Sequence, residues 1–244
     1  MIFEASKFTF MPPPLVSRAR RVLIKPNAAY PLPYPISTSR ETINQIVESI
    51  KQVSDADIII LEGTPNGESV YPIYQALGYD FPRVLMLDVK DCIWVEVENP
   101  LPHPFAVATF WVPNVVLSSD YLISVAPFTI RGNSSSSFSI KNLLSLLPLS
   151  KYKGEAFGGW ETLYGLGIDK VTADLYFTLP FDSGIIDARQ KFISADSPHE
   201  GKTEEYGKIF SGEPYEVDRE ATQASGIKAG YLELIEAGRA ELET

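Results

Sequence analysis

The sequence is poor in the residues from which metal and redox centres are built. It contains one cysteine, Cys92, and two histidines, His103 and His199, in 244 residues. A single cysteine excludes an internal disulfide, a four-cysteine zinc site and an iron–sulfur cluster held by this chain alone. Apolar residues follow Cys92, which favours a buried strand position, and each histidine lies beside a proline with no second ligand at metal-binding spacing. The sequence therefore predicts no metal and no cofactor.

Long apolar runs, clustered basic residues and glycine-rich phosphate loops are also missing. No segment reaches the roughly 18 unbroken apolar residues of a membrane span, and Glu4 and prolines 12–14 interrupt any signal-peptide core. The net charge of -10 argues against nucleic-acid binding, which needs clustered lysine and arginine. Neither a dinucleotide fingerprint nor a Walker pattern is present. We expect a cytoplasmic protein that binds neither nucleic acid nor a membrane.

The charge is unevenly distributed along the chain. From Asp196 to the end there are 12 acidic and 5 basic residues, whereas residues 1–25 hold 5 basic residues and one acidic residue. A solvated acidic surface explains this distribution. Two complementary patches that meet in a homo-oligomer are the alternative.

Hydrophobic patterning predicts a strand–helix–strand unit near the N-terminus. Residues 22–24 and 58–61 are short apolar runs typical of buried strands. Between them, Thr38 and Glu41 fit a capping box, and apolar residues recur at helical spacing behind it. We therefore expect the two strands to be parallel neighbours, with a helix over 39–53 across one face of their sheet.

Further elements are expected along the rest of the chain, and no flexible linker divides it. A strand from Asp120 is expected to stop at Pro127, since proline cannot continue a sheet ladder. The whole pattern predicts one α/β domain over residues 1–244, with a mixed, mostly parallel sheet and flanking helices. Other strands are expected within 83–98 and 105–117 and at 184–187 and 207–210, and other helices before Gly78, from 137 to 147, over 161–179 and twice at the C-terminus.

Four segments, taken in order, resemble the family catalogued as domain of unknown function 362. The fourth is similar to that family's Gly-x-Asp-Pro segment, with Glu213 in place of its aspartate. The resemblance covers nearly the whole chain and implies an α/β fold. The four segments are Val22 to Asn27, Asp120 to Val125 with Ser139 to Pro148, Ile185 to Asp187, and Ser211 to Gly226.

The sequence also departs from this family. Members typically carry a Lys-x-Lys-x-His stretch after the strand that contains Asp120, and Pro127, Thr129 and Arg131 stand at those places here. Many members also carry a ferredoxin-like Cys-x-x-Cys module, which this sequence lacks. A fainter similarity to the N-terminal domain of nickel-pincer lactate racemases lacks the histidines of that chemistry. Neither resemblance therefore implies a redox or nickel function for this chain.

Polar residues at predicted strand and helix ends indicate an anion site. Lys25 and Asn27 end the first strand, and Ser37, Thr38 and Arg40 precede or begin the first helix. Ligands of open α/β sheets bind at the carboxyl ends of strands, and helix N-termini attract anions. The alternative is that Asn27 makes a turn, Thr38 caps the helix and Arg40 is solvated.

Lys141 and Asn142 add to this interpretation, because a lysine near a helix start opposes the helix dipole unless an anion lies nearby. Three acidic residues at element ends, Glu62, Asp187 and Asp218, could also enter one cleft and bind magnesium or act as acid and base. The alternatives are a surface lysine, an end-capping Glu62 and a solvated Asp218.

Two functions follow from these residues. The first is binding of a small phosphate- or carboxylate-bearing metabolite, with or without catalysis. The second is a catalytically inactive scaffold or assembly subunit. If Lys25 is a direct ligand, Lys25→Ala abolishes stabilisation by the ligand and leaves the unliganded melting temperature nearly unchanged.

Overall fold

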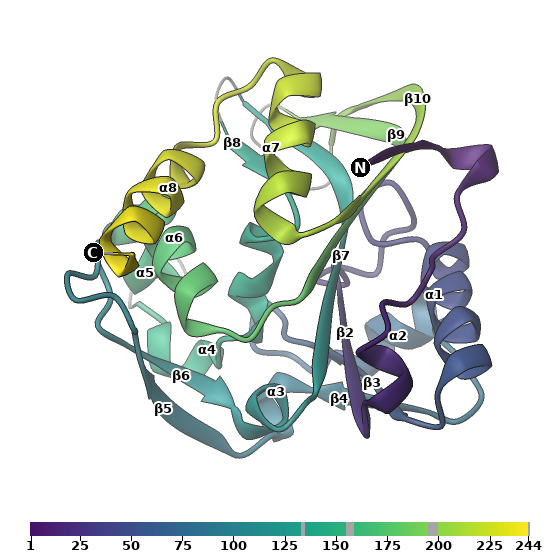
Figure 1. The fold of residues 1–244 in the computed structure, drawn as a ribbon, viewed down its shortest axis with the longest axis horizontal. Helices are drawn as coiled ribbons and strands as arrows, with labels where there is room; N and C mark the ends of the chain where they lie inside the picture. Colours follow the sequence, from purple (N-terminus) through teal and green to yellow (C-terminus); the bar gives the residue numbers. More distant parts are fainter. Residues whose placement is uncertain (133–134, 155–158, 195–199, 244) are drawn as a thin grey trace.

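A computed structural model describes residues 1–132, 135–154, 159–194 and 200–243, and Figure 1 shows their arrangement. His199 lies outside the described residues. Among those residues, no helix is both long and apolar enough to cross a membrane.

An eight-stranded mixed sheet forms the centre of the fold. Its strand order is β1-β10-β9-β7-β2-β3-β4, and β8 pairs with the end of β7. The strands β9, β7, β2, β3 and β4 are parallel, whereas β1, β8 and β10 run antiparallel to their neighbours. The predicted mixed, mostly parallel α/β fold is therefore confirmed. The sheet consists of β1 (Ile2–Glu4), β2 (Arg21–Pro26), β3 (Asp57–Glu62), β4 (Val84–Asp88), β7 (Tyr121–Arg131), β8 (Ser135–Ser137), β9 (Ser183–Ser194) and β10 (Lys202–Gly212), and a separate antiparallel pair consists of β5 (Trp94–Glu98) and β6 (Thr109–Pro113).

The predicted strand–helix–strand unit is confirmed. β2 pairs with β3 in parallel from Arg21–Asp57 to Ile24–Ile60, and α1 (Arg40–Val53) connects them. Ile43, Ile46, Val47 and Ile50 of α1 are fully buried against the apolar side chains of one sheet face. A stripe at this spacing buries about a third of the helix surface, and tertiary packing of that stripe holds the helix.

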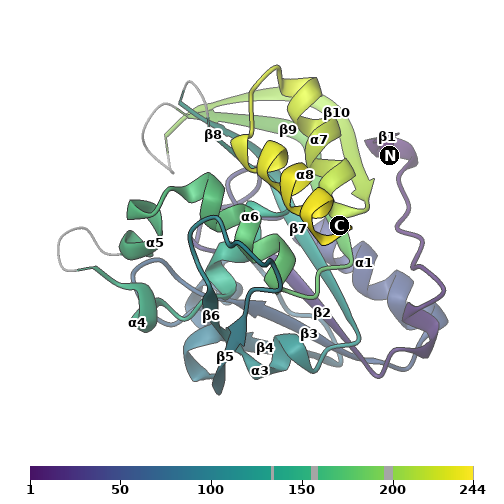
Figure 2. The same cartoon turned by 60° about the vertical axis from the view of Figure 1, so that its left-hand side comes forward.

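Helices cover both faces of the parallel strands. α1 and α2 (Tyr71–Ala76) lie on one face, and α5 (Glu161–Gly165) and α6 (Ile168–Thr178) lie on the other, as Figures 1 and 2 show. α7 (Pro214–Ser225) packs on β9 and β10, and α8 (Gly230–Leu242) packs on α6. The remaining short helices are α3 (Asn114–Leu117), α4 (Leu149–Tyr152) and the 3-10 turns η1 (Ala5–Lys7), η2 (Val16–Arg18), η3 (Val89–Asp91) and η4 (Lys141–Leu146).

The start of α1 differs from the predicted capping box. Ser39, not Thr38, is the N-cap residue, and its side chain accepts a hydrogen bond from the Glu41 amide. The Thr38 hydroxyl instead accepts from the Asn27 amide at 2.7 Å and donates to the Val125 carbonyl at 2.6 Å. Thr38 therefore ties the loop after β2 to β7, a tertiary role that the local pattern did not reveal.

The expectation that Pro127 ends its strand is also wrong. β7 continues to Arg131, because the proline lies at a register shift between β7 and β9 that accommodates it. Pro127 pairs with Asp187 and Phe128 pairs with Lys191, so residues 188–190 of β9 have no partner in β7. The helix predicted over 137–147 is also shorter than expected. Only the 3-10 turn η4, from Lys141 to Leu146, forms there.

Candidate functional site

A buried ion pair joins the carboxyl ends of β2 and β3. Lys25 and Glu62 are both fully buried, and the Lys25 Nζ atom lies 2.8 Å from Glu62 Oε1 and 2.9 Å from Oε2. Nζ also donates to the Pro26 carbonyl at 2.6 Å. Burial lowers the pKa of the Lys25 ammonium, and the Glu62 carboxylate opposes that effect.

Three further groups donate hydrogen bonds to the Glu62 carboxylate. Its carboxylate accepts from the Ala28 amide at 2.8 Å, the Gly63 amide at 2.9 Å and the Ser145 hydroxyl at 2.6 Å. A buried charge with this many partners is held in one position. The pair is therefore a fixed element of the strand ends, and Lys25 is not exposed to an external anion.

Asn142 connects this pair to η4 and β7. Its Oδ1 accepts from Lys25 Nζ at 3.4 Å, and its Nδ2 donates to the Lys25 carbonyl at 3.1 Å and to Ser124 Oγ at 3.0 Å. Ser124 in turn donates to the Ser139 carbonyl at 2.7 Å. These bonds fix the main chain on either side of Lys141.

Asp218 anchors the far end of the same hydrogen-bonded chain. It is fully buried and accepts from Ser139 Oγ at 2.5 Å, from the Ser139 and Ile140 amides at 2.9 and 3.0 Å, and from the Tyr231 hydroxyl at 2.8 Å. Burial raises the pKa of the Asp218 carboxyl to about 6, although the four donors act in the opposite direction. Asp218 therefore holds the segment that leads into η4 and is not exposed to a ligand.

A cavity of about 230 Å³ opens beside this buried network. Two of its eleven described lining residues, Arg131 and Lys141, are cationic, and none of the eleven is acidic. The wall also contains the rings of Tyr30, Trp160 and Tyr164. The lining residues are Asn27, Ala29, Tyr30, Pro65, Arg131, Lys141, Asn142, Leu144, Ser145, Trp160 and Tyr164.

Lys141 differs from Lys25 in its surroundings. It is only partly buried, and among the described residues no hydrogen-bond or ion-pair partner lies close to its Nζ atom. Burial lowers the pKa of the Lys141 ammonium, the Asp169 carboxylate opposes this effect, and Arg131 lowers the pKa to a smaller extent. A negative charge bound inside the cavity would raise the pKa of Lys141 again.

Comparison with known proteins assigns the chain to a family. A family model described as Domain of unknown function (DUF362) matches residues 22–223. The chain belongs to this family. A search of curated proteins finds no match to this sequence.

A solved structure similar to this DUF362 chain is the lactate racemase apoprotein from Thermoanaerobacterium thermosaccharolyticum. The two chains are 14% identical and superpose with a TM-score of 0.54, over 90% of this chain and 53% of the racemase chain. At that identity the likeness shows the shared α/β fold alone. The DUF362 chain spans about half the length of the racemase.

The structure brings only part of the predicted site together in this DUF362 chain. Asn27, Lys141 and Asn142 line one cavity, while Lys25 and Glu62 lie behind it in the buried pair. Lys25 points neither to bulk solvent nor into the cavity.

The other predicted residues lie elsewhere. Arg40 donates to the Gly78 carbonyl at 2.6 Å and lies over the Phe81 ring. Asp187 is fully buried and accepts from Thr42 Oγ1 at 2.6 Å and from Arg189 at 2.7 Å.

The expected cleft of three carboxylates does not form. Glu62, Asp187 and Asp218 are each occupied by separate donors, and no cluster of three His, Cys, Asp or Glu side chains able to hold a metal occurs in the described part of the chain. His103 contacts Glu241 at the surface.

Several cavity residues escaped prediction. Arg131 was noted only as a departure from the family pattern, and nothing local marks Tyr30, Trp160 or Tyr164 as cavity residues. They come from separate loops and short helices, so only the folded chain brings them to one place.

Proposed function

We propose that this protein binds a small phosphate- or carboxylate-bearing metabolite in the cavity beside η4. The observation that carries the proposal is Lys141, a partly buried cation in the cavity wall that forms no hydrogen bond or ion pair within 4.0 Å among the described residues and feels the Asp169 carboxylate only through a longer-range interaction. A charge removed from water without a counter-ion is costly, and such a cost is tolerated where an anion supplies the missing charge.

The wider charge distribution supports the same proposal. The chain carries a net charge of -10, yet two cations and no carboxylate occur among the described lining residues. Anions in solution are repelled by most of such a surface and attracted where cations gather. We assign direct contact with the anion to Lys141, Arg131 and Asn27, and a supporting role to Asn142, because its amide already bonds the strands.

Replacing Lys141 with methionine tests this assignment. Sulfate should raise the free energy of unfolding of the wild-type protein, by about 2.7 kcal/mol at a hundredfold excess over the dissociation constant. Lys141→Met should lose most of that gain, because methionine keeps the length of the side chain and removes its charge. Thermal unfolding in sulfate, compared with sodium chloride at equal ionic strength, measures the difference.

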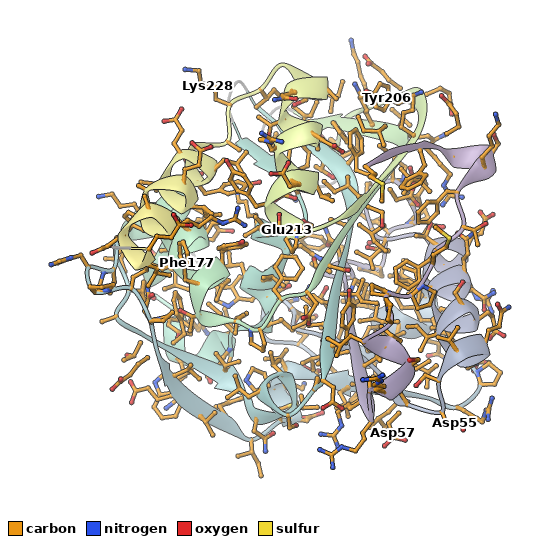
Figure 3. All side chains as sticks on the ribbon, viewed as in Figure 1. Asp55, Asp57, Phe177, Tyr206, Glu213 and Lys228 are labelled. Carbon is orange, nitrogen blue, oxygen red and sulfur yellow. The ribbon has the colours of Figure 1, made fainter. Side chains whose placement is uncertain are left out.

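Lys228→Met is the matched control, since Lys228 is exposed and its side chain extends away from the ribbon in Figure 3. This variant should respond to sulfate as the wild type does. Equal stabilisation of all three proteins would contradict the assignment. Absence of any sulfate effect in the wild type would instead favour the scaffold function.

Sulfate affinity should also fall as pH rises. The pKa of Lys141 is lowered in the unliganded protein, and a bound anion raises it, so binding is accompanied by proton uptake above the unliganded pKa. Affinity is therefore highest below that pKa and decreases through the alkaline range. Sulfate keeps its charge across this range, so titration calorimetry between neutral and alkaline pH isolates the protein group, and a flat profile would speak against Lys141.

A further inference from the structure

Two lysines lie next to Asn142, Lys25 by a hydrogen bond and Lys141 in sequence, and their surroundings differ. Lys25 bonds both oxygens of the buried Glu62 carboxylate, and this ion pair favours the protonated form of Lys25. Lys141 has no such partner in the described part of the chain, and it faces a cavity that also contains Arg131. Burial lowers the pKa of the Lys141 amine, so this amine loses its proton more readily than a surface lysine, and an unprotonated amine is a nucleophile.

We propose that Lys141 forms a Schiff base with the carbonyl group of a small 2-oxo acid held in the same cavity. This proposal rests on the proposed function, because the carboxylate of the 2-oxo acid takes the place of the bound anion. A 2-oxo acid carries its carbonyl carbon next to its carboxylate, so one small molecule engages Arg131 and Lys141 together. A volume of about 230 Å³ lies below the roughly 300 Å³ at which drug-sized pockets begin, which limits the acid to a short chain.

The step balances without a further reactant. The Lys141 lone pair attacks the carbonyl carbon, and the electrons of the C–O double bond move to oxygen, which takes up a proton. The resulting carbinolamine loses water, a carbon–nitrogen double bond forms, and the protonated product is an iminium ion. No electrons are gained or lost overall.

The groups that face Lys141 suit this chemistry. Arg131 from β7 disfavours a second positive charge, Asp169 from α6 favours it, and both act on the amine from a distance. Tyr164 lines the same cavity, and burial raises the pKa of its phenol, so this group stays protonated and can donate a hydrogen bond. The ring of Trp160, itself buried and held by a bond from Nε1 to the Leu147 carbonyl at 2.9 Å, forms an apolar wall.

Trapping with pyruvate and sodium cyanoborohydride tests the proposal. Cyanoborohydride reduces an iminium ion to a stable amine, so intact-mass and peptide mass spectrometry reports how fast each lysine is modified. At neutral pH Lys141 should be modified several times faster than Lys228, because burial lowers the pKa of Lys141 and leaves a larger fraction of its amine unprotonated. Lys141→Met should lose the fast-forming adduct, Lys228→Met should retain it, and sulfate should suppress it.

The rate of Lys141 modification should rise with pH, because the amine reacts only without its proton. The affinity for sulfate should fall over the same pH range. Modification of Lys141 at the rate of Lys228, in a protein that still binds sulfate, overturns the Schiff base and leaves the anion site standing. Modification that sulfate does not suppress also overturns it, since amine and anion would then not share the cavity. If the wild-type protein shows neither sulfate binding nor a fast-forming adduct at Lys141, both the anion site and the Schiff base are overturned.

Discussion

Lys25→Met is expected to lower the free energy of unfolding by about 3–5 kcal/mol. The substitution removes one partner of a fully buried pair and leaves the Glu62 carboxylate charged and away from water. The Ala28 and Gly63 amides and the Ser145 hydroxyl still donate to Glu62, but none of them carries a compensating charge. The sequence-based expectation that a change at Lys25 leaves the melting temperature unchanged is therefore replaced by its opposite.

A double-mutant cycle measures how much of that loss comes from the unpaired charge. Lys25→Met with Glu62→Gln removes both charges and keeps one carbonyl oxygen as acceptor, so it should be less destabilised than the sum of the single variants. Urea unfolding of all four proteins at neutral pH gives the coupling, and Lys228→Met, an exposed lysine, should change stability by less than about 0.5 kcal/mol. A loss below about 1 kcal/mol for Lys25→Met would mean that water reaches the pair.

Asp218→Asn is expected to destabilise the protein most at low pH. Asparagine offers one acceptor oxygen where Asp218 meets four donors, so the variant loses bonds at every pH. The wild-type pKa of about 6 lies above the ordinary value near 4, so the folded state binds more protons than the unfolded state between these values. Wild-type stability from this group is fully present below pH 4 and decreases as pH rises to 6.

The stability gap between the wild type and Asp218→Asn should therefore narrow by about 2–3 kcal/mol from pH 4 to pH 7, at about 1.4 kcal/mol per pKa unit. Urea unfolding at several pH values measures the gap, and taking the difference cancels the other titrating groups. Asp55→Asn serves as control, because Asp55 is exposed at the surface in Figure 3. A gap that stays constant with pH would show that Asp218 ionises with its ordinary pKa.

Periodicity and apolar runs were enough to predict the centre of the fold. The parallel pairing of β2 with β3 and the apolar face of α1 follow from residues close in sequence. Thr38 was misassigned because both it and Ser39 are good capping residues, and the difference lies in a bond to β7, 87 positions away. Pro127 was misread because the bulge that accommodates it belongs to another strand.

The candidate site was predictable to a smaller extent. Lys25 and Glu62 are the first charged residues after the apolar runs of adjacent parallel strands, so their pairing follows once those strands are taken as neighbours. The sequence reasoning named both residues and assigned them to different sites. Lys141 and Asn27 were correctly selected as residues at element ends, but the surrounding aromatic wall depends on loop positions that no periodic pattern determines.

The bonds that run from Glu62 to Asp218 also bear on how such a sequence can change over evolution. Each member bonds the next, so loss of the charge at Lys25 leaves the Glu62 carboxylate without its counter-ion, and loss of the Asn142 amide removes the donor that it supplies to Ser124 and to the Lys25 carbonyl. A variant with a single replacement contains an unpaired buried polar group and is destabilised. A variant in which both partners are replaced together avoids this cost. These positions are thus expected to be inherited and exchanged as a set, while the exposed rim of the cavity stays free to diverge one residue at a time.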